Sequence, residues 1–78
     1  MNLEIITPEK TIFNGEVKLV QLHGIAGSFE ILANHARMIA SLKKGKIKVV
    51  ENDKSTRFIE INGGTLKVQD NRILILAN

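Results

Sequence analysis

The chain has 78 residues, which fits one domain spanning residues 1–78; a domain of this size buries only about 60% of the surface of its unfolded chain, so little core is left for a deep substrate cleft. It contains no cysteine, which excludes disulfides and thiolate zinc sites, and two histidines do not build a closed metal site alone, so we expect no metal and no cofactor. Eleven basic and eight acidic side chains give a net charge of +3, which permits an acidic or nucleic-acid partner without demanding one.

Short apolar runs and frequent turn residues predict an all-β chain. Runs of about 4–8 residues rich in Val, Ile, Leu and Phe are separated by glycine and asparagine, a spacing typical of a sandwich or barrel. Each turn signal can supply the positive φ or the side-chain-to-backbone bond that a tight turn needs. The signals are Asn14–Gly15, Gly24–Gly27, Lys44–Gly45, Asn52–Asp53, Asn62–Gly64 and Asp70–Asn71.

The first half of the chain holds two irregular segments. In Glu16–Leu22 the polar–apolar alternation slips at Leu19–Val20, which predicts a bulge or a strand whose outer face is also covered. In Ala33–Leu42 apolar residues recur at helical spacing after a possible N-cap at Asn34. The periodicity of this second segment leaves a short helix and a strand both open.

The second half of the chain alternates more regularly. Lys46–Val49 and Thr65–Val68 place polar residues on one face and aliphatic residues on the other, which predicts a sheet with one wet and one dry face. Ile73–Leu76 is apolar at every position and is expected to be a central strand or to be covered on both sides. No apolar run approaches the roughly 20 residues of a membrane span, so we expect membrane contact only through a partner.

The two histidines are the first candidates for catalysis. His35 has the chemistry of a general base or a partner contact, but the sequence fixes no serine or carboxylate beside it. His23 precedes Gly24 in a predicted turn and is expected to be a solvated loop residue. Because no paired carboxylates or phosphate loop stand elsewhere, we expect no catalytic residue and no enzymatic activity.

A lysine cluster raises the alternative of a small nucleic-acid-binding β-barrel. Binders of single strands combine such charge with aromatic stacking platforms, and this chain has three Phe, no Tyr and no Trp. We expect all three Phe residues in the core, so a solvated sheet face is the favoured interpretation. The lysines are Lys43, Lys44, Lys46 and Lys48, and the aromatic residues are Phe13, Phe29 and Phe58.

A third interpretation concerns Lys54. It lies between Asp53 and Ser55 at a predicted hairpin tip, where lipoyl and biotinyl carrier domains, also all-β and near this size, carry a modified lysine. The match is three residues long, so an ordinary polar turn is the favoured alternative.

Three stretches, taken in order, resemble one family: the epsilon subunit of the bacterial rotary ATP synthase, called delta in mitochondria. The resemblance implies a flattened two-sheet β-sandwich of about ten short strands, with a strand after the histidine at position 35. The stretches are Leu3–Lys10 continued by Ile12–Val17, then Gly24–Ala36, and finally Gly63–Asn71.

The resemblance also implies a function. Such a subunit is a non-catalytic part of the central stalk of the proton-translocating ATP synthase, and it couples rotation of the membrane ring to ATP synthesis by binding the gamma subunit and the c-ring. We therefore expect a peripheral location at the cytoplasmic face of the bacterial inner membrane, through the complex, and no nucleic-acid partner. Many members continue into a C-terminal helical hairpin that can inhibit ATP hydrolysis; we expect this hairpin, and its inhibition, to be absent here.

The family's partner contacts transfer to five positions, and we hypothesise a sixth. By resemblance, Thr7 and His35 face gamma, while Gly24, Gly27 and Ser28 face the c-ring. The family usually has an acidic residue where Ser28 stands and glycine where Glu30 stands. Because strand positions two apart share a face, we hypothesise that Glu30 supplies the displaced negative charge and also faces the ring.

Overall fold

The computed structural model describes all residues 1–78 and consists of β-strands without a helix. The structure has eight strands, fewer than the expected ten or so, and one strand of 14 residues runs through both layers of the fold. No helix capable of crossing a membrane is present. The strands are β1 (Asn2–Ile6), β2 (Thr11–Gly24), β3 (Gly27–Leu32), β4 (Met38–Leu42), β5 (Gly45–Glu51), β6 (Thr56–Ile61), β7 (Gly64–Gln69) and β8 (Arg72–Ala77).

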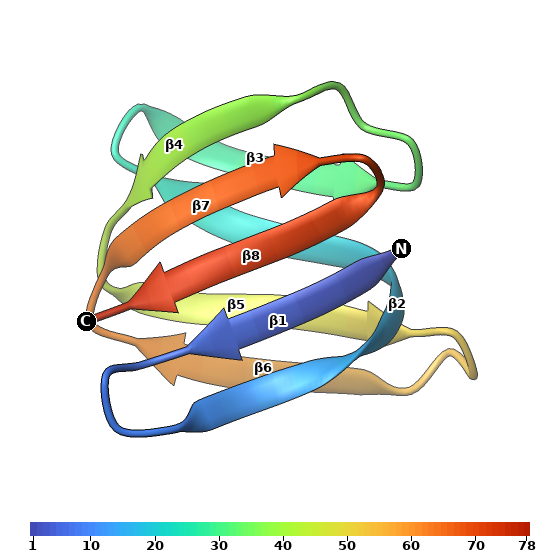
Figure 1. The fold of residues 1–78 in the computed structure, drawn as a ribbon, viewed down its shortest axis with the longest axis horizontal. Helices are drawn as coiled ribbons and strands as arrows, with labels where there is room; N and C mark the ends of the chain where they lie inside the picture. The colour runs from blue at the N-terminus through green and yellow to red at the C-terminus, as the bar shows by residue number, and fades with distance from the viewer.

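Two layers of strands pack face to face (Figure 1). The front layer contains β4, β7, β8, β1 and the first half of β2, joined in that order by backbone pairing. The back layer contains β3, the second half of β2, β5 and β6. With extents of 27 × 24 × 19 Å, the domain is a flattened β-sandwich, as the family resemblance implied.

The core lies between the layers and consists of aliphatic side chains and one phenylalanine, with no buried polar residue. Alternation decides which residues enter it: on β7, Leu66 and Val68 are buried while Lys67 is exposed, as predicted. The sixteen buried residues are Leu3, Ile5, Phe13, Val17, Val20, Leu22, Ile31, Leu42, Ile47, Val49, Ile61, Leu66, Val68, Ile73, Ile75 and Ala77.

The predicted irregularity in β2 is confirmed. The register of β2 against β5 shifts between Val17 and Leu19, one step from the expected position. The strand pairs with β1 before this point and with β3 and β5 after it. A bulge bends a strand and increases its twist, which is what passage from one sheet to the other requires.

Two turn signals had opposite outcomes. Asp70–Asn71 forms the predicted two-residue turn between β7 and β8, with φ of 54° and 60° at the two residues, as a type I′ hairpin requires. The turn predicted at Asn14–Gly15 was wrong, because both residues lie inside β2, opposite Glu4 and Leu3 of β1. The chain turns earlier, where the Thr7 hydroxyl bonds the backbone of Lys10, so Asn14–Gly15 continues the strand.

The ambiguous segment 33–42 is a turn followed by strand β4. Asn34 has φ of 63° and lies in the turn, so it caps no helix. In β4, Met38 and Ala40 pack against the core while Ile39 is 72% exposed, a period of two. The family resemblance predicted this strand, whereas the residue pattern alone left it open.

The apolar strand β8 and two of the three phenylalanines lie where they were expected. β8 is central, between β1 and β7, as predicted. Phe13 is buried and Phe29 packs against the core. Phe58 was expected in the core, but this was wrong. Its side chain is 62% exposed, because Phe58 lies on the outward face of β6, opposite Lys48 of β5.

Candidate interaction surfaces

The β2–β3 hairpin forms one end of the domain. Gly24 and Gly27 are register partners, and only Ile25 and Ala26 lie between them. A Cβ atom at Gly24 would lie 2.8 Å from the Phe29 ring and 3.0 Å from the Gly27 carbonyl oxygen, so glycine is required there by close packing. Gly24 and Gly27 therefore build the tip that the resemblance assigns to the ring-facing surface.

His23 pairs with Ser28 across this hairpin. His23 Nδ1 and Ser28 Oγ are 2.9 Å apart, and the two residues are register partners. The expectation that His23 is a solvated loop residue was wrong, because it lies in β2, is half-buried and packs over Gly45. A two-residue turn between Gly24 and Gly27 sets residues 23 and 28 opposite each other. The pairing of His23 with Ser28 could therefore have been predicted from the turn signal.

Glu30 lies on the same outward face of β3 as Ser28, as its spacing predicted. It stands one row further from the tip, opposite Gln21, and Lys48 is the next residue in that row. The Glu30 carboxylate forms no ion pair within the chain. Whether it replaces a charge at position 28 stays a prediction.

Thr7 and His35 lie at opposite ends of the front layer. Thr7 directly follows β1, next to the end of β8, because Ile6 pairs with Leu76. His35 lies in the β3–β4 loop, whose Asn34 amide donates a 2.8 Å hydrogen bond to Asn71 Oδ1 in the β7–β8 turn. Figure 1 shows the β1–β2 turn and the β3–β4 loop at diagonally opposite corners of this layer.

Exposed aliphatic residues occupy the outer face of the front layer between those corners. Ile39 begins a cross-strand row that continues through Lys67 and Leu74. The neighbouring row holds Leu76, which is 47% exposed and lies opposite Ile6 of β1. A sheet face with exposed large aliphatic side chains is a candidate protein-binding surface.

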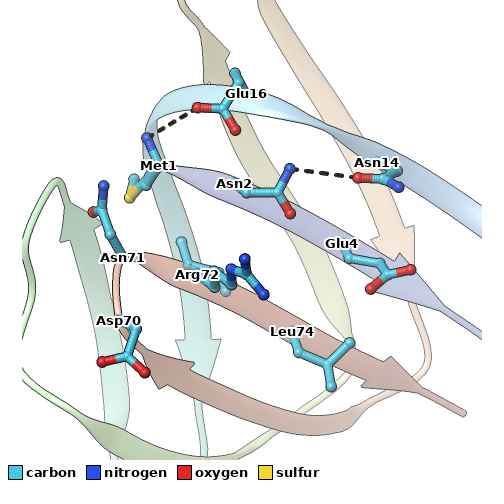
Figure 2. A pocket seen from close by; sticks show the side chains of 10 residues that line it. Met1, Asn2, Glu4, Asn14, Glu16, Asp70, Asn71, Arg72 and Leu74 are labelled. Atoms are coloured by element: carbon cyan, nitrogen blue, oxygen red, sulfur yellow. Dashed lines mark hydrogen bonds and ion pairs between the residues drawn. The ribbon is translucent and has the colours of Figure 1, made fainter.

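A polar hollow of about 720 Å³ adjoins these rows, at the end of the face where the chain starts (Figure 2). The Met1 ammonium group lies 3.6 Å from Glu16 Oε1, and the Asn2 and Asn14 side chains point toward each other across β1 and β2. The carboxylates that line the hollow are dispersed around it. No group of three or more His, Cys, Asp or Glu in the chain is placed to hold a metal ion. The hollow therefore extends the outer face as a polar margin.

The geometry gives neither histidine the arrangement of a catalytic site. His35 Nδ1 is 2.7 Å from the carbonyl oxygen of Ala36, its own neighbour, and the residue is exposed. His23 and Ser28 have the contact of a base and a nucleophile, but no third group orients the imidazole through its other nitrogen. The pair is best explained as a cross-strand hydrogen bond that stiffens the tip.

The β5–β6 turn carries Lys54, with φ of 72°, at the predicted hairpin tip. Beside it, the Ser55 hydroxyl and amide both donate hydrogen bonds to Asp53 Oδ1, and these bonds hold the pKa of the Asp53 carboxyl below its ordinary value of 3.8. Lys54 itself forms no side-chain contact that would distinguish it from a polar turn residue.

We expect Asp53→Asn to remove a small, pH-dependent contribution to stability. Because the folded-state pKa is lowered, the carboxylate stabilises the turn above about pH 4, and this contribution is lost as the pH falls through the folded value. Urea unfolding should separate the two proteins slightly at neutral pH and not in strong acid. Ser55→Ala should show the same convergence; a difference that persists in acid would contradict the assignment.

Comparison with known proteins identifies the family. Residues 1–78 match the family described as ATP synthase, Delta/Epsilon chain, beta-sandwich domain. The chain belongs to this family. An ATP synthase epsilon chain of Chlorobium limicola is 40% identical over 75 residues, covering 96% of this chain and 85% of the relative. One of Campylobacter jejuni subsp. doylei is 43% identical over 77 residues, but this chain spans 60% of its length.

Solved structures share the fold of this family. One such chain belongs to the Euglena gracilis mitochondrial ATP synthase, described as OSCP/F1/c-ring in rotational state 1. It has a TM-score of 0.90 at 22% identity, and the match covers 96% of this chain and 48% of the Euglena chain. A chain in the Tetrahymena thermophila central stalk/c-ring structure has a TM-score of 0.82 at 20% identity. The match covers 99% of this chain and 62% of the Tetrahymena chain. The β-sandwich and the resemblance to epsilon subunits are both confirmed.

Proposed function

We propose that this chain is a non-catalytic subunit of the ATP synthase central stalk, where it binds the gamma subunit and the c-ring and couples ring rotation to ATP synthesis. Family membership over residues 1–78 supports a role in the ATP synthase, and one structural neighbour comes from the central stalk and c-ring of the Tetrahymena thermophila ATP synthase. The domain would lie at the cytoplasmic face of the bacterial inner membrane, held there by its partners.

The observation that carries the gamma contact is the aliphatic outer face of the front layer. Ile39, Leu74 and Leu76 stand exposed or half-exposed there, although a monomer gains nothing from solvating them. The face runs from the β3–β4 loop with His35 to the β1–β2 turn with Thr7. One broad partner resting on this face would touch both residues, even though they lie at opposite corners.

The ring contact is assigned to the β2–β3 end, with Gly24, Gly27 and Ser28 at the tip and Glu30 one row behind. Its support is rigidity: the turn is short, and the Ile25 amide donates a 3.1 Å hydrogen bond to the Ser41 carbonyl of β4. A stiff end transmits force between partners without local unfolding, which a coupling subunit needs.

We expect Ile39→Lys and Leu76→Lys each to weaken gamma binding at least tenfold, because a lysine ammonium would have to be desolvated in the interface. The measurement is calorimetric titration of the full chain against purified gamma from the same organism. Thr7→Ala and His35→Ala should have smaller effects, at the two corners of the contact.

Phe58→Lys is the matched control, since Phe58 is also exposed but lies on the back layer. It should leave the affinity within about twofold of wild type, with an unchanged circular dichroism spectrum for all variants. If Phe58→Lys weakens binding and the front-layer variants do not, gamma docks on the back layer instead. No binding of the wild-type chain to well-folded gamma would remove the proposed function.

A further inference from the structure

The end of the sandwich at the β2–β3 turn also carries three exposed lysines. Lys43 and Lys44 lie in the β4–β5 loop, and Lys46 is the second residue of β5. None of their ammonium groups forms an ion pair or a hydrogen bond within the chain, whose two ion pairs lie elsewhere. This end therefore presents positive charge that the fold leaves uncompensated.

The lysines and the hairpin tip form one rigid platform. The Lys43 amide donates a 3.0 Å hydrogen bond to the His23 carbonyl, and the Ile25 amide donates to Ser41. These bonds tie β4 and the β4–β5 loop to the β2–β3 turn on both sides of Gly24. At the tip, Ile25 is 71% exposed, so an apolar contact stands beside the basic side chains.

Acidic residues near this end do not balance the charge. Glu60 is the register partner of Lys46 but forms no ion pair with it. Glu30 stands one row behind the tip, in the row that contains Lys48. The surface nearest the tip is therefore basic, although the hypothesis from the family resemblance places a negative charge at Glu30 in the ring contact.

We propose that this end recognises an acidic loop of its ring partner, with Lys43, Lys44 and Lys46 pairing to carboxylates and Ile25 packing between them. The inference rests on the proposed function, since it names the chemistry of the partner at the ring-facing end. Lysine ammonium groups pair with carboxylates, and an adjacent apolar contact excludes water and strengthens that pairing.

A protein loop fits this end better than a membrane surface does. Binding to anionic lipid through charge uses clusters of about four to eight basic residues, or a broad apolar face inserted between headgroups. Here three exposed lysines and a single exposed isoleucine lie on adjoining segments. That is the size of a contact with one or two loops.

The test uses the full chain and the c-ring purified from the same organism, reconstituted in nanodiscs of neutral phosphatidylcholine. A triple variant, Lys43→Gln with Lys44→Gln and Lys46→Gln, should lose at least tenfold in ring affinity and most of the salt dependence of binding. Its affinity for gamma should stay unchanged. The matched control carries Lys10→Gln, Lys18→Gln and Lys54→Gln, which remove the same charge elsewhere, and should bind the ring like the wild type.

Each other outcome overturns the inference in a recognisable way. Ring binding by the triple variant equal to wild type would remove the lysine contact and leave the proposed ring contact standing. If the wild-type chain binds empty nanodiscs of anionic phosphatidylglycerol and the triple variant loses that binding to the same extent, the lysines would be assigned to lipid. A tenfold loss in Glu30→Gln with none in the triple variant would return the contact to Glu30. Binding to gamma without any binding to the ring would overturn the ring-facing assignment together with the inference.

Discussion

Ile75→Ala is expected to destabilise the domain by about 2–5 kcal/mol, the range seen when a buried isoleucine is truncated in a close-packed core. Ile75 is 0% exposed in the central strand β8, with Ile5 beside it on β1 and Leu66 beside it on β7. Those neighbours belong to paired strands and cannot collapse into the space left behind. Because small domains have only about 5–15 kcal/mol of stability, the loss would be a large share of the total and would lower the urea midpoint clearly.

The measurement is equilibrium unfolding in urea, and Leu76→Ala is the matched control. Leu76 is the next residue of the same strand and is 47% exposed, so its truncation should cost well under half as much. The two variants also separate stability from function: Leu76→Ala should weaken gamma binding in a folded protein. If both variants destabilise the domain equally, the face of β8 that carries Leu76 would have to be as buried as the face that carries Ile75.

The alternation of polar and aliphatic residues predicted sheets with one wet and one dry face because each strand has one face in the core, and the family resemblance selected the sandwich over a barrel. It correctly placed Leu66 and Val68 inside and the lysines of β5 outside. The two-residue turn at Asp70–Asn71 was equally predictable, since both residues tolerate positive φ. Such signals are local, and they worked where local preference and tertiary structure agree.

The errors arose where tertiary structure overrides a local signal. Asn14–Gly15 has the composition of a turn, but β1 pairs along that part of β2 and keeps it extended. Phe58 is apolar, but the pairing of β6 with β5 alone sets which face it occupies. The interaction surfaces depend on the same long-range pairing, because Ile39 and Leu76 come together only when β4, β7 and β8 are in register.

The largest backbone effect is expected for Gly64→Ala, at the first residue of β7. Gly64 has φ of +157° and pairs with both Leu42 and Ala77, so it lies where three strands meet. An added Cβ would collide with the carbonyl oxygen of Leu76 and lie 3.0 Å from the Ala77 Cα. Since both obstacles are backbone, no side-chain movement relieves them.

We expect the substitution to cost at least about 2 kcal/mol, measured as the shift of the urea midpoint at constant slope. Gly15→Ala is the control, because its Cβ would meet only the Phe13 ring at 3.5 Å, an ordinary contact inside a strand. It should change stability by less than about 1 kcal/mol, in either direction, as loss of glycine's freedom in the unfolded chain offsets any crowding. If Gly64→Ala unfolds at the wild-type midpoint, β7 and β8 are less closely paired there than the register indicates.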